Sequence, residues 1–515
     1  MDHAAKADAV ADGNAADWFV DRHVREGRGG RMAFLDPARR LSYSDLATQS
    51  ARFSAGLAGA GIERERRIAL IMFDTVDFPI AFWGAIRAGV VPVPINTVLP
   101  AEMIAYMLAD SRAELAVIAA ELLPSLQTAL AASSSLRRIV VVGQEFDAFL
   151  GDADRFRHPV PTPSDEVAFW LYSSGSTGAP KGVRHVHGSL RATAETYGAQ
   201  VLAIEPDDLV FSAAKLFFAY GLGNAMTFPM SVGAASVLLP TRPTPDAVLD
   251  VMRTYQPTLF GGVPTLYASL LAHQAIGSGA GSCRLRRCIS AGEALPEQIG
   301  LAWRERVGCD ILDGIGSTDM LHIYLSNRPD AVHYGTSGQA VPGYDIRVVT
   351  DDGADAPAGE PGELLVRGPS AADGYWNQRA KSRRTFVGEW TYTGDKYIRQ
   401  EDGNYRYCGR TDDMFKVSGI WVSPFEVEGA LIAHPSVLEA AVVGHDDADG
   451  LTKPRAFVVL RDGADDTPAL REALKQHVKD RAGAWKYPRW IEFVDDLPKT
   501  ATGKIQRYKL RGGPC

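Results

Sequence analysis

The chain has 515 residues, of which 46% are hydrophobic and 23% charged, and its formal net charge is −8. This composition excludes a mainly disordered chain, and net acidity without a long run of Lys and Arg argues against nucleic acid as the main partner. No apolar stretch approaches the roughly 18 to 20 residues of a membrane span, and the first residues lack an apolar core of signal-peptide length. We therefore expect a cytoplasmic protein that has no membrane partner.

Short β-branched runs alternate with helical patterns through most of the chain, which is typical of α/β proteins. The first unit is a strand at 67–73, a helix at 78–88 and a strand at 90–93. Crossover units of this kind predict largely parallel sheets. Between 335 and 368 the pattern changes to short strands among Gly and Pro residues, which favours a small antiparallel subdomain. Further strands are expected at 115–119, 138–142, 167–172, 235–239, 285–290, 344–350 and 362–366.

A second, smaller α+β unit is predicted near the C-terminus. Ser423 and Glu426 form the pattern of a capping box around Pro424, which would be the first helical residue. This helix should end before His434. The other expected elements are strands at 414–417, 438–443, 456–460 and 490–494 and a helix at 468–481.

These two patterns divide the chain into an N-terminal domain, 1–410, and a C-terminal domain, 411–515. The charged segment 409–412 lies between the two predicted cores, which makes it a hinge candidate. An ordinary surface turn would have the same sequence character, so the segment alone does not decide between them.

The most informative segment is 172–182, Tyr-Ser-Ser-Gly-Ser-Thr-Gly-Ala-Pro-Lys-Gly, which directly follows a predicted strand. Its hydroxyl residues, its glycines and Lys181 supply backbone donors, side-chain donors and a positive charge, the groups that bind phosphate. It is not a Walker loop, because Lys181 lies between Pro180 and Gly182 instead of in G-K-[S/T] at a helix start. Composition alone leaves a plain flexible loop equally open. The lysine after Ala-Pro and the preceding strand favour a cradle for a triphosphate.

With further segments, this one resembles the core motifs of the acyl-adenylate-forming (ANL) enzymes, in the same order and over essentially the whole chain. That family includes acyl-CoA synthetases, carrier-protein adenylation domains and luciferases. One match would be weak evidence, whereas several in register are strong. The resemblance implies a large N-terminal domain, which binds ATP and the acid, and a small mobile C-terminal domain. The further segments are 290–296, 314–319, 392–395, 409–413 and 498–504.

The family's chemistry explains why cations gather at such a site. A carboxylate must be activated before a thiol can attack it, because oxide is a poor leaving group. The acid therefore attacks the α-phosphate of ATP to give an acyl-AMP and pyrophosphate, and the CoA thiolate then displaces AMP. Negative charge accumulates at phosphorus in the first step, which requires cations and fixed donors. The resemblance thus implies ATP, Mg²⁺ and CoA.

The resemblance also assigns a role to individual residues. The phosphates would be held by Ser173, Ser174, Gly175, Thr177, Gly178 and Lys181. The nucleotide would otherwise contact Gly292, Glu293, Ala294, Asp313, Gly314 and Thr318. Asp395 would accept the ribose hydroxyls, and Arg410 would support the sugar. Lys504 would bridge the carboxylate and the α-phosphate and complete a catalytic set with Thr177 and Lys181, although outside its Thr-Gly context it would be interpreted as a surface lysine.

One position departs from the family pattern. Where the family usually has Gly-Ser-Thr-Glu, this chain has Asp319, whose side chain is one methylene shorter. The resemblance gives this carboxylate and Thr177 to Mg²⁺, which prefers tight octahedral oxygen ligation. A water-bridged ion would suit the shorter side chain, and direct ligation stays open.

The second half-reaction requires other groups at the same small site. The family solves this by rotating the C-terminal domain, and Asp412 matches the hinge position. In the rotated pose Lys416 and Gly419 would line a channel for pantetheine, where a glycine leaves the approach open. Basic residues of the tail could attract the phosphates of CoA, although a solvated charged face explains any single one of them. They are Lys486, Arg489, Lys499, Lys504, Arg507, Lys509 and Arg511.

Within the family, segments 215–224, 320–327 and 417–428 look most like the benzoate–CoA ligase branch. Aromatic and aliphatic walls suit a flat aromatic acid. The ring substituents cannot be predicted, because a single hydrogen bond can decide them, so hydroxybenzoates and 2-aminobenzoate stay open. By this resemblance the aryl ring would be surrounded by Ala219, Tyr220, Phe228, Gly316, His322 and Ile323.

Other functions are weighed on the same residues. A carrier-protein adenylation enzyme would share the first half-reaction, and it stays open as the less favoured alternative. A luciferase-like oxygenase is neither excluded nor suggested. A nucleotide-binding regulator without chemistry is disfavoured, because such a protein would be expected to lose Lys181 or Lys504. Nothing in the sequence sets the oligomeric state, and a homodimer stays open.

Overall fold

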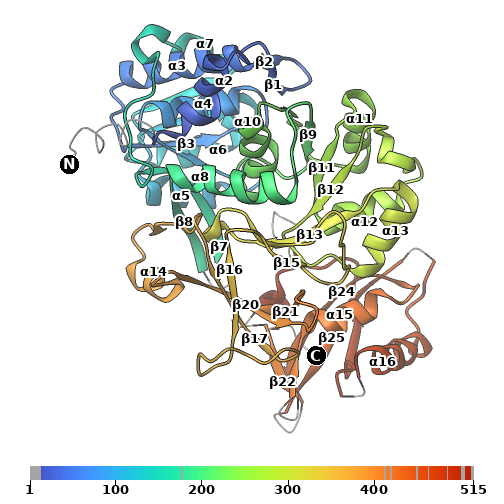
Figure 1. The fold of residues 1–515 in the computed structure, drawn as a ribbon. Coiled ribbons are helices and arrows are strands. Elements are labelled where there is room, and N and C mark those ends of the chain that lie inside the picture. The colour runs from blue at the N-terminus through green and yellow to red at the C-terminus, as the bar shows by residue number, and fades with distance from the viewer. Residues whose placement is uncertain are drawn as a thin grey trace.

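The computed structural model describes residues 13–175, 178–410, 413–417, 420–447, 451–461, 463–483, 485–499 and 505–511. Figure 1 shows the chain running from the N-terminal elements at the top, in blue and green, to the C-terminal elements at the bottom, in orange and red. Parallel strand pairs build the two main sheets of the N-terminal part, which confirms the α/β class. Among the described helices, none combines the length and apolar character needed to cross a membrane.

The first sheet has four parallel strands in the order β4-β3-β5-β6. Every residue of β5 is buried, as expected for a parallel strand covered on both faces. The long helix α3 (Tyr43–Gly59) begins with a capping box formed by Ser42 and Asp45. The strands are β3 (Arg67–Ile71), β4 (Val91–Pro94), β5 (Leu115–Ala119) and β6 (Arg138–Val142), and the helices between them are α4 (Asp77–Arg87), α5 (Ala101–Ser111), η2 (Ala120–Leu122) and α6 (Leu123–Ala131).

The second sheet has nine strands in the order β15-β14-β13-β12-β11-β9-β10-β1-β2. Strands from β13 to β1 in this order pair in parallel, and β14, β15 and β2 are antiparallel to their neighbours. The carboxyl ends of β11, β12 and β13 therefore lie at one edge, where ligands of α/β proteins bind. The strands are β1 (Met32–Leu35), β2 (Arg40–Ser42), β9 (Leu209–Ser212), β10 (Ala235–Val237), β11 (Leu259–Gly262), β12 (Arg287–Ser290), β13 (Ile311–Gly316), β14 (Ile323–Ser326) and β15 (Gln339–Ala340).

Helices cover both faces of this sheet. On one face a core around Trp303 joins Phe211, Phe260 and Cys288 to the helices α11, α12 and α13. On the other face the helices after β8 and β9 join the main core of the N-terminal part. The covering elements are α11 (Pro245–Tyr255), α12 (Pro264–Ala272) and α13 (Glu297–Val307), and on the second face α8 (His187–Thr193), η4 (Ala194–Val201), α9 (Ala219–Leu222), η5 (Gly223–Thr227) and α10 (Phe228–Val232). Shorter elements are η1 (Asp17–Asp21), α2 (Arg22–Arg25), α7 (Phe146–Phe149), η3 (Ala153–Phe156) and η6 (Ser278–Gly281).

Two smaller sheets lie between these layers and the C-terminal elements (Figure 1). The hairpin of β7 (Val167–Gly175) and β8 (Gly178–Val186) is joined by β18 (Gly374–Tyr375), which pairs with β8. The predicted antiparallel subdomain is confirmed, because all strand pairs of the next sheet are antiparallel. It contains β16 (Asp345–Val349), β17 (Pro361–Arg367), β19 (Phe386–Val387), β20 (Trp390–Arg399) and β21 (Tyr405–Arg410), with α14 (Arg379–Thr385) preceding β19.

The C-terminal α+β unit has its own apolar core, built from α15, α16 and the sheet β24-β25-β26. Ser423 caps α15 by accepting the Glu426 amide, but the Glu426 carboxylate pairs with Lys486, so the capping box is only half formed. The ring of Phe425 packs against the ring of Tyr407 of β21, with 4.6 Å between the two ring centres. The elements are β22 (Phe415–Val417), β23 (Ile420–Val422), α15 (Pro424–Ile432), β24 (Val437–Asp446), β25 (Thr452–Leu460), α16 (Pro468–Ala482), β26 (Trp490–Phe493) and α17 (Arg507–Leu510).

Candidate active site

The glycine- and serine-rich segment forms a hairpin instead of one continuous loop. Strand β7 carries its first half and β8 its second, and Ser173 lies opposite Lys181 while Gly175 lies opposite Gly178. The hairpin therefore places residues 173 and 181 on facing strands although eight positions separate them. Thr177 falls outside the described residues, as does the side chain of Ser174.

Lys181 is buried and held by two neighbours. Its ammonium donates a hydrogen bond of 2.6 Å to the Tyr375 hydroxyl and lies 3.5 Å from Asp319 Oδ2. Burial lowers the pKa of Lys181, and the charge of Asp319 opposes that shift. A buried cation is suited to bind an anion, because little water screens the attraction between the two charges.

Asp319 lies in the 3-10 turn η7 (Thr318–Met320), directly after β13. Its Oδ1 is buried and makes no hydrogen bond within the described part of the chain, so one oxygen of this carboxylate is left without a described partner. The turn is held by β8, because His185 Nε2 donates a hydrogen bond of 2.9 Å to the Thr318 carbonyl. Burial lowers the pKa of His185 to about 4, so this imidazole is neutral near pH 7.

A second buried carboxylate, Asp313, lies near the carboxyl end of β13. Burial raises the pKa of Asp313 to about 8. Its Oδ2 accepts the Leu295 amide at 3.4 Å, which fixes the segment that carries Gly292, Glu293 and Ala294. Gly314 must be a glycine, since a Cβ there would lie 2.6 Å from the Leu325 carbonyl oxygen of β14.

Asp395 and Arg410 form a cross-strand pair. They lie opposite each other on β20 and β21, and Arg410 Nη1 is 3.4 Å from Asp395 Oδ1. Asp395 is buried, whereas 42% of the Arg410 side chain is exposed. The pairing of the two strands thus places a buried acid beside a partly exposed base.

An aromatic enclosure surrounds His322, just after Asp319 in the chain. The ring centre of His322 is 4.5 Å from Phe228, 5.3 Å from Tyr197 and 5.8 Å from Tyr220. Its Nε2 donates to the Tyr220 carbonyl at 3.3 Å, and burial lowers the pKa of His322 to about 3, so the ring is neutral and behaves as an aromatic wall.

Two glycines make room for this arrangement. A Cβ on Gly223 would lie 2.3 Å from His322 Cδ2, and one on Gly316 would lie 2.5 Å from the His322 carbonyl oxygen. Ala219 is the first residue of α9, and Ile323 is the first residue of β14. The expected acid-pocket residues therefore come both from the nine-stranded sheet and from the helices that cover it. The structure therefore brings together Tyr220, Phe228, Gly316, His322 and Ile323 beside Asp319.

Comparison with known proteins decides the family. Residues 20–376 match the AMP-binding enzyme family, and residues 426–504 match the AMP-binding enzyme C-terminal domain. The chain belongs to the AMP-binding enzyme family. It is 56% identical to the 4-hydroxybenzoate–CoA/benzoate–CoA ligase of Rhodopseudomonas palustris, over 98% of this chain and 94% of the relative. It is 53% identical to the benzoate–CoA ligase of Thauera aromatica, over 97% of this chain and 95% of that relative.

Solved structures agree with this assignment. A benzoate–CoA ligase from Burkholderia xenovorans LB400 has a TM-score of 0.87 at 47% identity, over 97% of this chain and 99% of that one. An anthranilate–CoA ligase bound to anthranoyl-AMP has a TM-score of 0.92 at 39% identity, over 96% of both chains. The predicted membership of the benzoate–CoA ligase branch of adenylate-forming enzymes is confirmed, and so is the predicted fold.

Several predicted residues of this AMP-binding enzyme cannot be placed. Lys504, Asp412 and Gly419 lie outside the described residues, and the side chain of Lys416 is not described. Conversely, sequence reasoning missed Tyr375, His185 and Tyr197. The one available signal was that Tyr375 belongs to a Gly-Tyr-Trp-Asn run, which could have been compared with the family's motifs.

The basic tail proves to be largely paired. Arg507 is buried, with its guanidinium 2.8 Å from Glu428, and Lys499 lies 2.7 Å from Glu439. Arg511 pairs with Asp413. Counting charges along the sequence therefore overstated the positive charge available to CoA phosphates.

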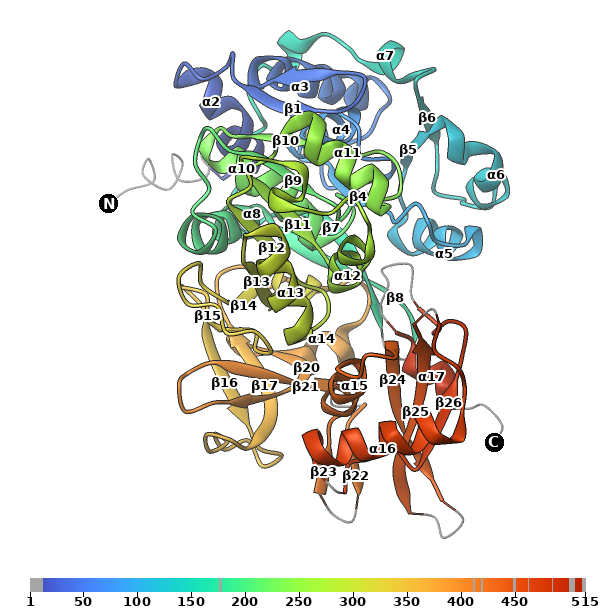
Figure 2. The ribbon, with the colours of Figure 1, turned by 90° about the vertical axis from the view of Figure 1, so that its right-hand side faces the viewer.

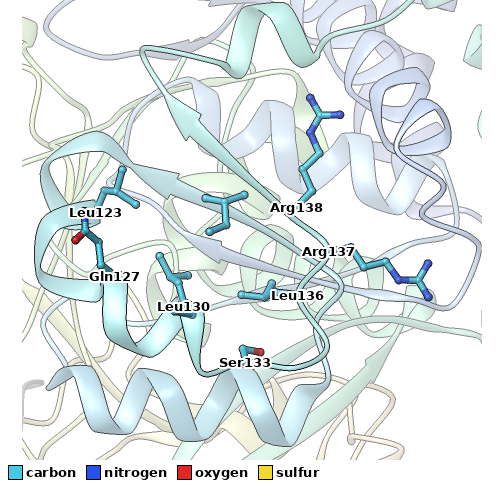
Figure 3. Close-up of a pocket in the computed structure, with 9 residues that line it drawn as sticks. Leu123, Gln127, Leu130, Ser133, Leu136, Arg137 and Arg138 are labelled. Atoms are coloured by element: carbon cyan, nitrogen blue, oxygen red, sulfur yellow. The ribbon is translucent and has the colours of Figure 1, made fainter.

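A surface pocket of about 380 Å³ lies elsewhere, between α6 and β6 (Figure 3). Figure 2 places these two elements at the far side of the N-terminal part, away from β13 and β20. Its walls carry no carboxylate, imidazole or thiol, so it offers none of the site chemistry described above. It is lined by Leu123, Gln127, Leu130, Ala131, Ser133, Leu136, Arg137, Arg138 and Ile139.

Proposed function

We propose that the chain is an ATP-dependent aryl-CoA ligase. It activates benzoate or a substituted benzoate as the acyl-AMP with release of pyrophosphate, and it then transfers the acyl group to CoA. One observation carries the proposal: the segment from Asp313 to Ile323 joins the nucleotide side to the acid side. It supplies the buried acid of the adenine region, the carboxylate beside Lys181, and the His322 wall of the aromatic enclosure.

The described residues suit the first half-reaction. Lys181 supplies positive charge near the position where phosphate charge accumulates, and the Tyr375 hydroxyl orients it. The Asp395 carboxylate is an acceptor for ribose hydroxyls, held in place by Arg410. The enclosure of His322, Phe228 and Tyr220 excludes water from the ring side of the acid.

Mg²⁺ is the natural counter-ion of the triphosphate, and it would neutralise phosphate charge when bound. The unpartnered Oδ1 of Asp319 fits such an ion, as an oxygen ligand close to the phosphate-binding hairpin. Among the described residues no three His, Cys, Asp or Glu side chains converge on one point. This matches a metal held by one protein carboxylate, water and substrate phosphates.

The second half-reaction is proposed from the family motifs. The domain boundary falls near 410, with Asp412 as hinge, and rotation replaces Lys504 at the site by the segment that contains Lys416 and Gly419. ATP and CoA then share one site in two arrangements of the chain.

We also propose that the protein works in the cytoplasm, where both cofactors are available, and that it forms a homodimer, which light scattering tests.

The acid is proposed to be benzoate or a ring-hydroxylated benzoate. The relatives at 53% and 56% identity bear the names of benzoate–CoA and 4-hydroxybenzoate–CoA/benzoate–CoA ligases. The anthranilate–CoA ligase of Pseudomonas aeruginosa is more distant, at 36%. An enzyme that stops at the adenylate is the second candidate, since the p-hydroxybenzoic acid–AMP ligase FadD22 of Mycobacterium marinum is 31% identical over 97% of this chain.

ATP–pyrophosphate exchange with a panel of aryl and aliphatic acids tests the first step, and thioester formation with CoA tests the second. We expect benzoate to support both. Lys504→Ala should abolish exchange while keeping thioester formation from supplied benzoyl-AMP, and Lys499→Ala, five residues earlier and already paired with Glu439, should alter neither. Exchange without thioester would favour the AMP ligase, and absence of exchange with every aryl acid would refute both candidates.

A further inference from the structure

Asp74 is a buried carboxylate at the carboxyl end of β3, three residues after the strand ends. It is 3% exposed, and burial raises the pKa of Asp74 to about 6. The carboxylate is therefore mostly ionised near pH 7, although desolvating a charged group is unfavourable. A charge at this depth needs compensating contacts, and these contacts identify the part of the chain that Asp74 holds.

The described part of the chain gives Asp74 one hydrogen-bond partner, the backbone amide of Leu216. Both carboxylate oxygens accept this amide, each at 3.3 Å, and 142 positions separate the two residues. The positive charge of Lys215 opposes the effect of burial on the pKa of Asp74. The Lys215 ammonium donates to the carbonyl oxygens of Leu239 and Thr241, which fix its position. Asp74 is therefore bound to the segment around Leu216.

This contact joins the two main sheets of the N-terminal part. Asp74 follows β3 of the four-stranded sheet, and Leu216 follows β9 of the nine-stranded sheet. Leu216 lies in a turn, 215–218, that is closed by the Phe218 amide, which donates to the Lys215 carbonyl at 3.0 Å. Helix α9 begins at the next residue, Ala219. The carboxylate thus holds the turn that leads directly into α9.

The turn packs directly against α9. A Cβ on Gly221 would lie 2.1 Å from the Lys215 carbonyl oxygen and 2.4 Å from the Ala214 carbonyl oxygen. The backbones of the helix and the turn are therefore in close contact, and a glycine is required between them. Because no space separates the two, a displacement of the turn is transmitted to α9 and to Tyr220, which α9 carries.

Tyr220 connects this turn to the rest of the aromatic enclosure. Its carbonyl accepts a hydrogen bond of 3.3 Å from His322 Nε2, and its hydroxyl lies 3.0 Å from the carbonyl oxygens of Gly262 and Ile289. These contacts set the orientation of the phenol ring and of the imidazole. Asp74 is thus linked through the turn 215–218 to two walls of the enclosure.

We infer that Asp74 is a positioning residue for acid binding, whose carboxylate fixes the turn 215–218 and thereby the positions of Tyr220 and His322. The inference rests on the proposed function, in which these two side chains enclose the aryl ring, and it adds a residue from outside the motif segments. A wall that is held in place before the acid arrives need not be ordered during binding. Loss of the carboxylate should therefore weaken binding of the acid more than binding of the nucleotide.

Steady-state ATP–pyrophosphate exchange, with benzoate and ATP varied in turn, tests the inference. Asp74→Leu keeps a similar size and removes both acceptor oxygens. We expect the KM for benzoate to rise by about tenfold or more, because a hydrogen bond to a charged group is lost. The KM for ATP should stay close to the wild-type value, and kcat at saturating benzoate should change less than the KM for benzoate. Asp74→Asn keeps one acceptor oxygen at the same reach and should recover most of the affinity for benzoate.

Asp208→Asn is a matched control, because Asp208 is also a buried carboxylate beside β9, at the other end of the strand. It accepts the Glu205 amide at 2.7 Å and pairs with Arg286. Loss of its charge should lower the thermal stability and leave the KM for benzoate unchanged. If Asp74→Leu does not fold, Asp74→Ser applies the same test, because its hydroxyl is one bond too short to replace the carboxylate at the Leu216 amide.

A wild-type KM for benzoate in the folded Asp74→Leu or Asp74→Ser variant would overturn the inference. An equal rise in the KM values for both substrates would also overturn it, because a general loss of structure acts on both sites. Exchange by the wild-type chain separates these outcomes from the proposed function. Where benzoate supports exchange, either result removes the inference alone, whereas absence of wild-type exchange with every aryl acid refutes the function itself.

Discussion

A methyl group added at Gly223 should damage acid binding selectively. The backbone of Gly223 is helical, with φ of −64°, so alanine is compatible with the conformation and only sterics act. Its Cβ would lie 2.3 Å from His322 Cδ2, 2.6 Å from His322 Nε2 and 2.8 Å from Phe228 Cζ. Since carbon atoms pack at about 3.5 Å or more, the imidazole must withdraw by about 1 Å. That movement lengthens the 3.3 Å bond to the Tyr220 carbonyl.

Overpacking of this size costs about 1–3 kcal/mol. If the wall of the acid pocket bears that cost, the KM for benzoate rises by about 5- to 150-fold, at 1.36 kcal/mol per factor of ten. The KM for ATP should stay close to the wild-type value, because Lys181 and Asp395 are untouched. Steady-state exchange with each substrate varied in turn measures the two constants.

A matched substitution separates the steric effect from a general effect of alanine. Gly59 ends helix α3 and has no heavy atom within 4 Å of its added Cβ. Gly59→Ala should leave both constants unchanged and stabilise the fold slightly. A Gly223→Ala variant with wild-type KM for benzoate and wild-type thermal stability would refute the packing described around His322, and an equal rise in both constants would refute the separation of acid and nucleotide sides.

Three further predictions concern the charged groups. Tyr375→Phe keeps the ring and removes the hydroxyl that accepts a hydrogen bond from Lys181. Since hydrogen bonds to charged groups contribute about 1.5–3 kcal/mol, the rate of ATP–pyrophosphate exchange should fall by about tenfold or more. An unchanged rate would show that the hydroxyl does not hold the lysine. Burial lowers the pKa of His185 to about 4 and that of His187 to about 3, below the unfolded value near 6.5, so the unfolded chain binds more protons between these limits. The contribution of each neutral histidine to the free energy of unfolding should therefore be fully present above pH 6.5, and it should fall by about 2 kcal/mol from pH 7 to pH 5. Urea unfolding of His185→Gln should show a pH-dependent loss that is smaller by the contribution of one histidine. A profile as steep as that of the wild type would contradict this. Asp319→Glu should keep or raise the exchange rate, because it restores the family's longer carboxylate, and a collapse with normal folding would show that this interpretation of the metal site is wrong.

The fold was predictable where apolar runs were long enough to set the local structure. Strands β5 and β6 have the predicted bounds, because β5 is an uninterrupted apolar run and β6 is one after Arg138, its first residue. The shape of the proposed phosphate-binding segment was not predictable, since glycines and serines are equally compatible with a loop and with the ends of two paired strands. Only the pairing of Ser173 with Lys181 across the hairpin resolves it.

The candidate site was predictable as far as motifs reach along the chain. Asp313, Asp319 and His322 fall in one segment, so the family pattern finds all three. Tyr375 lies 194 positions from its partner Lys181, and its Gly-Tyr-Trp-Asn run does not by itself indicate that contact. Contacts of this kind depend on tertiary packing, which a single sequence does not contain.

The basic tail shows the same limit for charge. Its sign is correct in the sequence, but the carboxylates that neutralise it come from distant segments: Glu428 of α15 binds Arg507, and Glu439 of β24 binds Lys499. A buried arginine with a bidentate partner serves the core of the C-terminal unit, because removing either member would leave a desolvated charge. Attraction of CoA phosphates therefore does not follow from the number of basic residues, and the proposed thioester pose rests on the segment 416–419 and not on the net charge of the tail.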